Sequence, residues 1–271
     1  MNILDKIVAY KRKEVGERKE LYPIKLLQKS LYFSSPTVSL KKYLSRKDKN
    51  GIIAEFKRSS PSKGIINAYA DVEETSIDYM RAGASALSVL TDNHFFGGSN
   101  EDLKTARKFN FCPILRKEFI IDEYQLFEAR SIGADAILLI AEILSEKEVR
   151  QLSEIAKSLD MEVLMEVHSK DQLQKVSDMV DIIGVNNRNL ETFEVDINTS
   201  FDLLKYIPSD KYKISESGIS KPEIVCQLKE AGFNGFLIGE LFMQSSHPGR
   251  KCAKFIDELN QLVNCQSVNQ E

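Results

Sequence analysis

Short apolar runs alternate with longer amphipathic stretches along most of the chain beyond residue 50. Each apolar run is rich in aliphatic residues, and a polar or glycine-containing break separates it from an amphipathic stretch of roughly ten to sixteen residues. The pattern occurs eight times. The predicted strands cover 52–56, 86–91, 113–119, 136–141, 162–167, 182–187, 213–218 and 235–240.

The amphipathic stretches predict helices between these strands. They cover 72–83, 100–109, 122–133, 145–160, 169–179 and 221–232, with a weaker helix near 199–206 and a last one from about 248 to 263. Ser145 and Glu148 have the spacing of a capping box, Pro222 is typical of a first helical turn, and Gly232 is typical of a helix end.

Strands that are apolar throughout, rather than on alternate residues, indicate a parallel sheet covered on both faces. Eight β/α units favour a single (β/α)8 TIM barrel over residues 51–265, and a doubly wound open sheet is the alternative.

Residues 1–50 do not fit the repeat. The segment ILDKIVAYKRKEV is apolar at positions 3, 4, 7 and 8, which predicts an N-terminal helical extension packed on the barrel. Residues 266–271 are expected to form a C-terminal tail.

The composition is that of a globular protein and narrows the function classes. Of the 271 residues, 42% are hydrophobic and 28% are charged, and the net charge is −3. A near-neutral chain has no bulk electrostatic attraction for nucleic acid or for an anionic membrane, so neither is an expected partner. The longest apolar run, 136–141, is far shorter than the roughly 18 residues of a membrane span.

Cysteine and histidine spacing predicts neither a disulfide framework nor a metal site. The four cysteines include no pair two to four residues apart, and the three histidines are far apart along the chain. The N-terminus lacks the apolar segment of a secretory signal. We therefore expect a cytoplasmic protein, and these residues give no basis for a metal site.

Charged residues stand where several predicted strands end, and in a barrel these ends form the active face. Glu55 and Lys57 share parity on the first strand and so project to one side. Lys117 shares parity with Leu115 on the third strand and is the charge expected to point inward there. Glu166 shares parity with Leu164 and lies just before the end of the fifth strand. A lysine from one wall and a carboxylate from another form a general acid and base pair. The alternatives are a salt bridge at the barrel mouth for the first pair and an exposed acid for Glu166.

The last strands end in residues suited to binding. Asn186 and Arg188 share parity after the sixth strand and suit a hydroxyl or carbonyl group and a carboxylate, respectively. Gly218 and Gly239 follow strands seven and eight, where barrels often bind phosphate, and a short helix is expected from Glu240. With the serine-rich SSPSKG loop, these glycines predict a site for a substrate monophosphate, although ordinary turns would use the same residues.

The remaining candidate residues fall outside this acid and base set. We expect His94 and His168 to be non-catalytic, because neither is needed to complete the set. Phe95 and Phe96 precede two glycines in the second loop. They would either cover an aromatic substrate or serve ordinary loop packing.

Six segments, in this order and spacing, closely resemble the indole-3-glycerol-phosphate synthases of tryptophan biosynthesis. They are AEFKRSSPSKG, SVLTDNHFFGGS, ILRKEFIIDEYQ, IGVNNRNL, SESGI and LIGELFM. The resemblance extends from the N-terminal ILDKIVAYKRKEV to about residue 245. It implies a (β/α)8 barrel that closes the indole ring of 1-(2-carboxyphenylamino)-1-deoxyribulose 5-phosphate with loss of CO2 and water, without a cofactor or metal.

The resemblance also implies roles for individual residues. Lys117 matches the general acid toward the substrate carbonyl, and Glu166 matches its partner acid or base. Lys57 lies near the substrate carboxylate or acts as an acid in dehydration, and Glu55 aids proton removal. The remaining matches orient the substrate or bind its phosphate. The orienting positions are Asn186, Arg188, Glu216 and Ser217, and the phosphate positions are Ser60, Gly218, Gly239 and the Glu240 amide.

Small departures from the family pattern leave the implied activity in place. His94 replaces a lysine, Asn189 an aspartate and Ser215 an alanine. A sister phosphate-binding barrel, phosphoribosylanthranilate isomerase, would carry a cysteine on the first strand, which here reads IIAEF. A non-catalytic ligand-binding barrel would have lost some of the lysines and glutamates at the strand ends. We expect a monofunctional enzyme, and a monomer.

Overall fold

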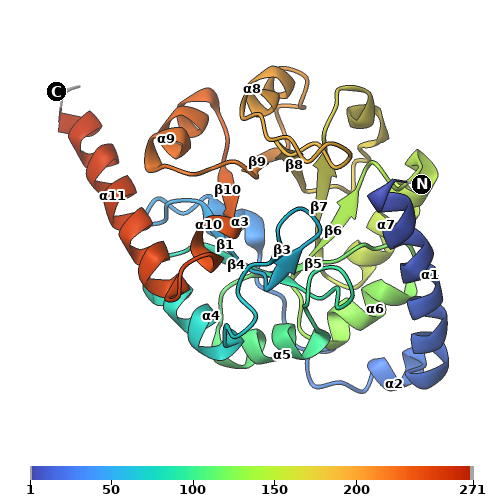
Figure 1. Cartoon of the computed structure of the whole chain (residues 1–271). Helices are drawn as coiled ribbons and strands as arrows, with labels where there is room; N and C mark the ends of the chain where they lie inside the picture. The colour runs from blue at the N-terminus through green and yellow to red at the C-terminus, as the bar shows by residue number, and fades with distance from the viewer. Residues whose placement is uncertain (1, 269–271) are drawn as a thin grey trace.

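The computed structural model describes the backbone of residues 2–268 and the side chains of residues 2–264. A closed barrel of parallel strands forms its centre, in the order β1-β10-β9-β8-β7-β6-β5-β4 (Figure 1). Because β1 pairs with both β4 and β10, the predicted barrel is confirmed and the open sheet is excluded. The barrel strands are β1 Ile52–Phe56, β4 Ala86–Leu90, β5 Ile114–Lys117, β6 Ala136–Ile140, β7 Glu162–Val167, β8 Ile182–Asn186, β9 Tyr212–Glu216 and β10 Gly235–Ile238.

Helices surround the barrel, as the amphipathic stretches predict (Figure 1). They are α4 Val72–Arg81, α5 Asn100–Phe109, α6 Tyr124–Ser131, α7 Glu146–Ser158, α8 Asn198–Leu204, α9 Pro222–Ala231, α10 Glu240–Met243 and α11 Pro248–Val268. The Ser145 and Glu148 capping box is present, and Gly232 ends α9 with a φ of 118°. The last helix continues to Val268, so the first residues of the expected tail 266–271 are helical, and residues 269–271 lie outside the described residues. Within residues 2–268, no helix is long and apolar enough to cross a membrane.

The predicted helix over 169–179 is wrong. Only a short 3-10 helix, η1 Asp171–Lys175, forms there. The side chain of Gln172 accepts a hydrogen bond from the backbone N–H of His168 at 2.6 Å, and Lys175 donates to the carbonyl of Ala141 at 2.7 Å. These contacts with the ends of β6 and β7 hold the segment in a tight turn, so tertiary structure overrides the helical pattern.

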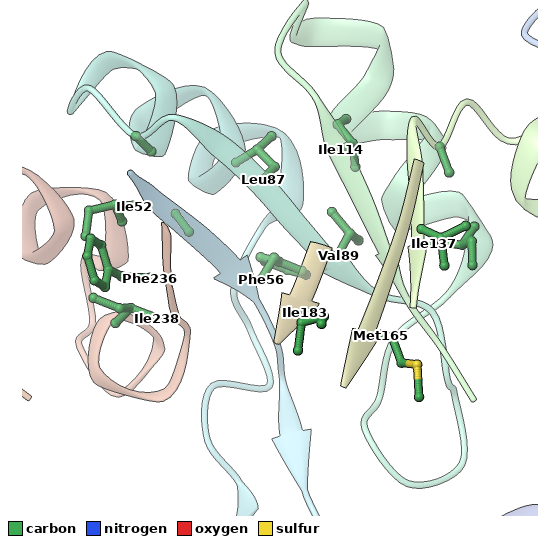
Figure 2. Packing of buried hydrophobic residues seen from close by; sticks show 14 of the residues in the cluster. Ile52, Phe56, Leu87, Val89, Ile114, Ile137, Met165, Ile183, Phe236 and Ile238 are labelled. Atoms are coloured by element: carbon green, nitrogen blue, oxygen red, sulfur yellow. The ribbon is translucent and has the colours of Figure 1, made fainter. Parts of the chain in front are cut away.

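Successive residues of each strand pack on opposite sides of the barrel wall. Ile52, Leu87 and Phe236 belong to the layer between strands and helices (Figure 2). Ile53 and Leu115 belong to a second cluster that fills the barrel interior. On each strand, the residues that alternate with the layer facing the helices point into the barrel. Polar residues at such positions near the carboxyl ends of the strands therefore point into the barrel mouth.

The predicted N-terminal extension is present as three helices and contacts both ends of the barrel. They are α1 Ile3–Leu21, α2 Ile24–Leu27 and α3 Leu40–Leu44. Leu44 of α3 lies beside Gly235, at the start of β10, and so closes the amino end of the barrel. Leu4 and Ile7 of α1 belong to the same interior cluster and reach the opposite end. A small hairpin of β2 Ser59–Ser60 and β3 Gly64–Ile65, not predicted from the sequence, follows β1.

Candidate active site

A cavity of about 510 Å³ opens at the carboxyl ends of the barrel strands. Every site residue predicted from the sequence lines it. These residues are Glu55, Lys57, Ser60, Lys117, Glu166, Asn186, Arg188, Glu216, Ser217, Gly218, Gly239 and Glu240. Because they come from strands far apart in the sequence, it is closure of the barrel that brings them together.

Lys117 connects three strands across this cavity. Its Nζ lies 3.1 Å from Oε2 of Glu166 on β7 and also donates to Oε2 of Glu216 on β9. Burial lowers the pKa of Lys117, but the negative charges of Glu216 and Glu166 outweigh it, and the net pKa is raised. The ammonium is therefore charged at neutral pH and is held between two carboxylates.

The two carboxylates beside Lys117 differ in their protonation. For Glu166, burial raises the pKa, but the positive charges of Lys117 and His168 and a 2.9 Å hydrogen bond from Asn186 lower it more, so the net pKa is lowered. For Glu216, burial dominates and the neighbouring Glu166 adds to it, so the pKa rises to about 7. Glu166 is thus ionised at neutral pH, whereas Glu216 exchanges a proton there.

One oxygen of Glu216 is left for a ligand. Its Oε1 is buried and has no hydrogen-bond partner among the described residues. Gly184 on β8 makes room for this oxygen, because a Cβ atom at position 184 would lie 2.7 Å from it. A buried acceptor without a partner is costly, so this oxygen is suited to a donor group that arrives with the substrate.

Glu55 and Lys57 form an ion pair in the cavity wall. Oε1 of Glu55 lies 3.0 Å from Nζ of Lys57, and Ser88 donates to Oε2 of Glu55 at 3.2 Å. Both side chains are largely buried and line the cavity, so the salt bridge given as the alternative is present, and it lies within the cavity rather than on the surface. Gly239 packs against Glu55, and a Cβ there would lie 2.7 Å from Oε1.

The side of the cavity near β9 and β10 carries the residues predicted to bind phosphate. Ser217 and Gly218 both have positive φ, of 70° and 76°, and this conformation is uncommon for serine. Arg188 was predicted to bind a carboxylate. In the structure it donates a hydrogen bond at 3.1 Å to Glu240, which is a carboxylate of the protein itself. Lys63 also lines the cavity and lies 3.8 Å from Glu240. Lys63 was not predicted from the sequence as a site residue, although it belongs to the SSPSKG loop.

The apolar part of the wall was only partly predicted. Leu4 and Ile7 line the cavity together with Phe96, Phe119 and Leu190. The 3, 4, 7, 8 pattern marked Leu4 and Ile7 as buried but not as part of the site. Of the two phenylalanines expected either to cover an aromatic substrate or to pack within the loop, Phe96 lines the cavity. By contrast, Phe95 packs edge-on against Tyr10 and His94.

The two histidines near the mouth have different surroundings. His94 stacks on Tyr10 with ring centroids 4.3 Å apart. His168 Nε2 lies 3.5 Å from Oε1 of Glu166. Among the described residues, no group of three or more histidine, cysteine, aspartate or glutamate side chains is arranged to hold a metal ion.

Solved structures with a similar fold include the tryptophan synthase complex and its alpha-subunit from Pyrococcus furiosus. A mutant alpha-subunit gives a TM-score of 0.60 at 16% identity, and a chain of the complex gives 0.58 at 18% identity. Each comparison covers 79% of this chain and 99% of the other. At this identity the likeness concerns the TIM-barrel fold alone.

Sequence comparison is more specific. The family model "Indole-3-glycerol phosphate synthase" matches residues 4–255. A protein of that name from Bacteroides thetaiotaomicron is 49% identical over 94% of this chain and 98% of its own length. Another, from Aliarcobacter butzleri, is 42% identical over 95% of this chain and 100% of its own. The chain therefore belongs to the indole-3-glycerol phosphate synthase family.

Proposed function

We propose that the residues around Lys117 carry out the ring closure of this family in the present chain. The enzyme is a carboxy-lyase of tryptophan biosynthesis that works without a cofactor. Its reaction converts 1-(2-carboxyphenylamino)-1-deoxyribulose 5-phosphate to indole-3-glycerol phosphate and releases CO2 and water. Three events need help from the protein: formation of a carbon–carbon bond, loss of the carboxylate and loss of a hydroxyl group.

In ring closure, the aromatic carbon that bears the carboxylate attacks the ketone carbon. The electron pair of the C=O bond moves to oxygen, which takes a proton from the Lys117 ammonium. Glu166, ionised and 3.1 Å from Nζ, keeps the lysine charged and aimed into the cavity. Loss of CO2 then returns the electrons of the broken carbon–carbon bond to the ring and restores its aromaticity.

In dehydration, the new hydroxyl group leaves as water after protonation, and a neighbouring C–H proton is removed. Lys57 either stands beside the substrate carboxylate or supplies the proton to the leaving hydroxyl. Glu55, 3.0 Å from Lys57, aids proton removal. Glu166 serves as a second acceptor because it is buried and ionised. No metal is required, since lysines and glutamates supply both acid and base.

Binding uses the opposite ends of the cavity. Apolar side chains, including Phe96 and Phe119, contact the aromatic ring. Asn186, Arg188 and Ser217 orient the reacting part of the substrate, and Glu216 accepts a hydrogen bond at Oε1. The remaining predicted residues bind the phosphate, namely Ser60, Gly218, Gly239 and the Glu240 amide. Anchoring the remote phosphate positions the reacting carbons.

The observation that carries the proposal is the Lys117 ammonium held by Glu166 and Glu216 inside the cavity. The test is conversion of the substrate by purified protein without added metal, followed by the growth of indole fluorescence. Lys117→Ala should lower kcat by about 10²–10⁴. Lys147→Ala, at an exposed position of α7, is the matched control and should leave kcat unchanged. Equal activity of Lys117→Ala and wild type would refute the proposed role.

We also propose that the enzyme acts in the cytoplasm as a monomer, with residues 1–50 as the extension and 51–265 as the catalytic barrel. The support is that residues of one chain, from α1 to α10, line the whole described cavity. Light scattering at assay concentration tests the oligomeric state, and a dimer that loses activity on dilution would contradict it.

A further inference from the structure

His168 contacts Glu166 from a different side than Lys117 does. Nε2 of His168 lies 3.5 Å from Oε1 of Glu166, whereas Lys117 contacts Oε2. Both imidazole nitrogens are buried and lack a hydrogen-bond partner among the described residues. Neither ring nitrogen is therefore committed to a hydrogen bond within the described part of the chain, and Nε2 is the nitrogen nearer the carboxylate.

A second cavity, of about 440 Å³, lies on the His168 side. Among the described residues, Glu166 lines the first cavity and not the second, and His168 lines the second and not the first. Asn186, Leu4 and Leu190 line both cavities and form the partition between them. His168 is thus the titratable group that lies between Glu166 and the second cavity.

The second cavity is acidic. The carboxylates of Glu142, Glu191, Glu194 and Asp196 line it, and Glu166 lies beside His168 on β7. Gln172, which anchors the backbone N–H of His168, also lines it, together with Asn187 and Asn189. These carboxylates give the second cavity a negative electrostatic potential, which attracts cations, protons included, to the side of His168 away from the first cavity.

A bound substrate fills the first cavity and removes its water, so a proton taken up by Glu166 cannot leave by that side. We propose that His168 acts through Glu166, holding the carboxylate ionised and passing the proton that Glu166 accepts to solvent by way of the second cavity. The O–H bond of protonated Glu166 breaks as an N–H bond forms at Nε2. Because both ring nitrogens are buried, the imidazolium then loses its other proton, from Nδ1, to water only when the ring turns toward the second cavity. An imidazole can carry out both steps because each of its two ring nitrogens can hold one proton. The inference rests on the proposed role of Glu166 as a proton acceptor.

The test replaces His168 by residues that keep polarity but do not titrate, His168→Asn and His168→Gln. In both variants kcat should fall about tenfold with KM little changed, and the acid limb of the pH–kcat profile should move to higher pH. Imidazole added to the buffer should restore kcat of the variants in proportion to its concentration. The wild type and His247→Asn, changed at an exposed position before α11, should not respond to imidazole.

Glu166→Gln, measured in parallel, separates this inference from the proposed function. If Glu166→Gln stays active, the proposed role of Glu166 fails and the relay fails with it. If Glu166→Gln is inactive while both His168 variants keep wild-type kcat and pH profile, the relay alone is overturned. A loss in the His168 variants that imidazole does not restore, in protein with an unchanged unfolding temperature, likewise overturns the relay.

Discussion

Nζ of Lys11 lies 3.0 Å from Oε1 of Glu118, the residue that follows Lys117 on the chain. The same ammonium lies 2.9 Å from Asp92, whose other oxygen accepts the backbone N–H of Phe95 in the loop after β4. Lys11 is only 2% exposed. One buried charge of the N-terminal helix thus joins the extension to two loops of the barrel mouth.

Removing this charge should destabilise the protein strongly. In Lys11→Met, Asp92 and Glu118 lose their buried counterion, which we expect to cost about 3–5 kcal/mol in the free energy of unfolding. Denaturant unfolding measures the loss. Lys13→Met, on the exposed side of the same helix with a side chain that is 78% exposed, should change stability by no more than about 0.5 kcal/mol. Similar losses in both variants would contradict the importance of the buried charge.

Leu4 tests whether the extension takes part in binding. Leu4→Ala removes part of the apolar wall of the cavity, so we expect KM to rise several-fold while kcat changes less than about twofold. Lys6→Ala, at an exposed position of α1, should leave both constants unchanged. Steady-state kinetics with fluorescence detection distinguishes the two. An unchanged KM in Leu4→Ala would show that α1 contributes stability alone.

Gly184→Ala should disturb the site through a single methyl group. Its Cβ would lie 2.7 Å from Oε1 of Glu216 and 3.0 Å from Leu164, so the carboxylate must move away from Lys117. We expect a clear fall in kcat and a loss of about 1–3 kcal/mol in stability. Gly16→Ala is the matched control in helix α1, with nothing within 4 Å of the new Cβ, and should stabilise by about 0.5–1 kcal/mol. Full activity of Gly184→Ala would contradict the close contact.

The raised pKa of Glu216 predicts a pH-dependent stability. Its pKa is about 7 in the folded protein and 4.5 in its ordinary state, so between these values the folded protein binds a proton that the unfolded chain has lost. The stability contributed by Glu216 is complete below pH 4.5 and is lost as the pH rises through 7. The lowered pKa of Glu166 changes the free energy of unfolding only at more acidic pH. The raised pKa of Lys117 changes it only at alkaline pH.

Glu216→Gln isolates this effect. Relative to the variant, the wild type should lose stability steadily from pH 5 to pH 7 and then level off, because other titrations cancel in the difference. Denaturant unfolding of both proteins at several pH values measures it. A constant difference over this interval would refute the raised pKa.

Sequence patterns predicted the strands well because most of them are short runs rich in apolar residues between polar or glycine-containing breaks. Parity then placed Lys117 on the side of Leu115 and Glu166 on the side of Leu164, and both side chains do face the cavity. Their mutual contact depends on strand order and closure, which no local pattern encodes. The resemblance to a family, rather than periodicity, identified Glu216 and Ser217 as site residues.

Features that depend on tertiary contacts escaped prediction. The segment 169–179 has a helical pattern, yet Gln172 and Lys175 are bound to the ends of β6 and β7, and only a short turn remains. Leu4 is apolar on a helix face, which predicts burial but not which cavity it faces. Gly184 leaves space for Oε1 of Glu216, and this role cannot be predicted from the sequence because it depends on the position of Glu216 in the folded barrel.

The pairing of β1 with β10 sets when the enzyme becomes competent during synthesis. Glu55 belongs to the first repeat and packs against Gly239 of the last, so one wall of the cavity consists of the earliest and latest parts of the barrel. A nascent chain that lacks β10 would already carry Lys117, Glu166 and Glu216, but its sheet would still be open. The unpaired backbone N–H and C=O groups of its edge strands could then pair with other chains. Catalytic competence and protection from aggregation are thus gained in the same late event of biosynthesis.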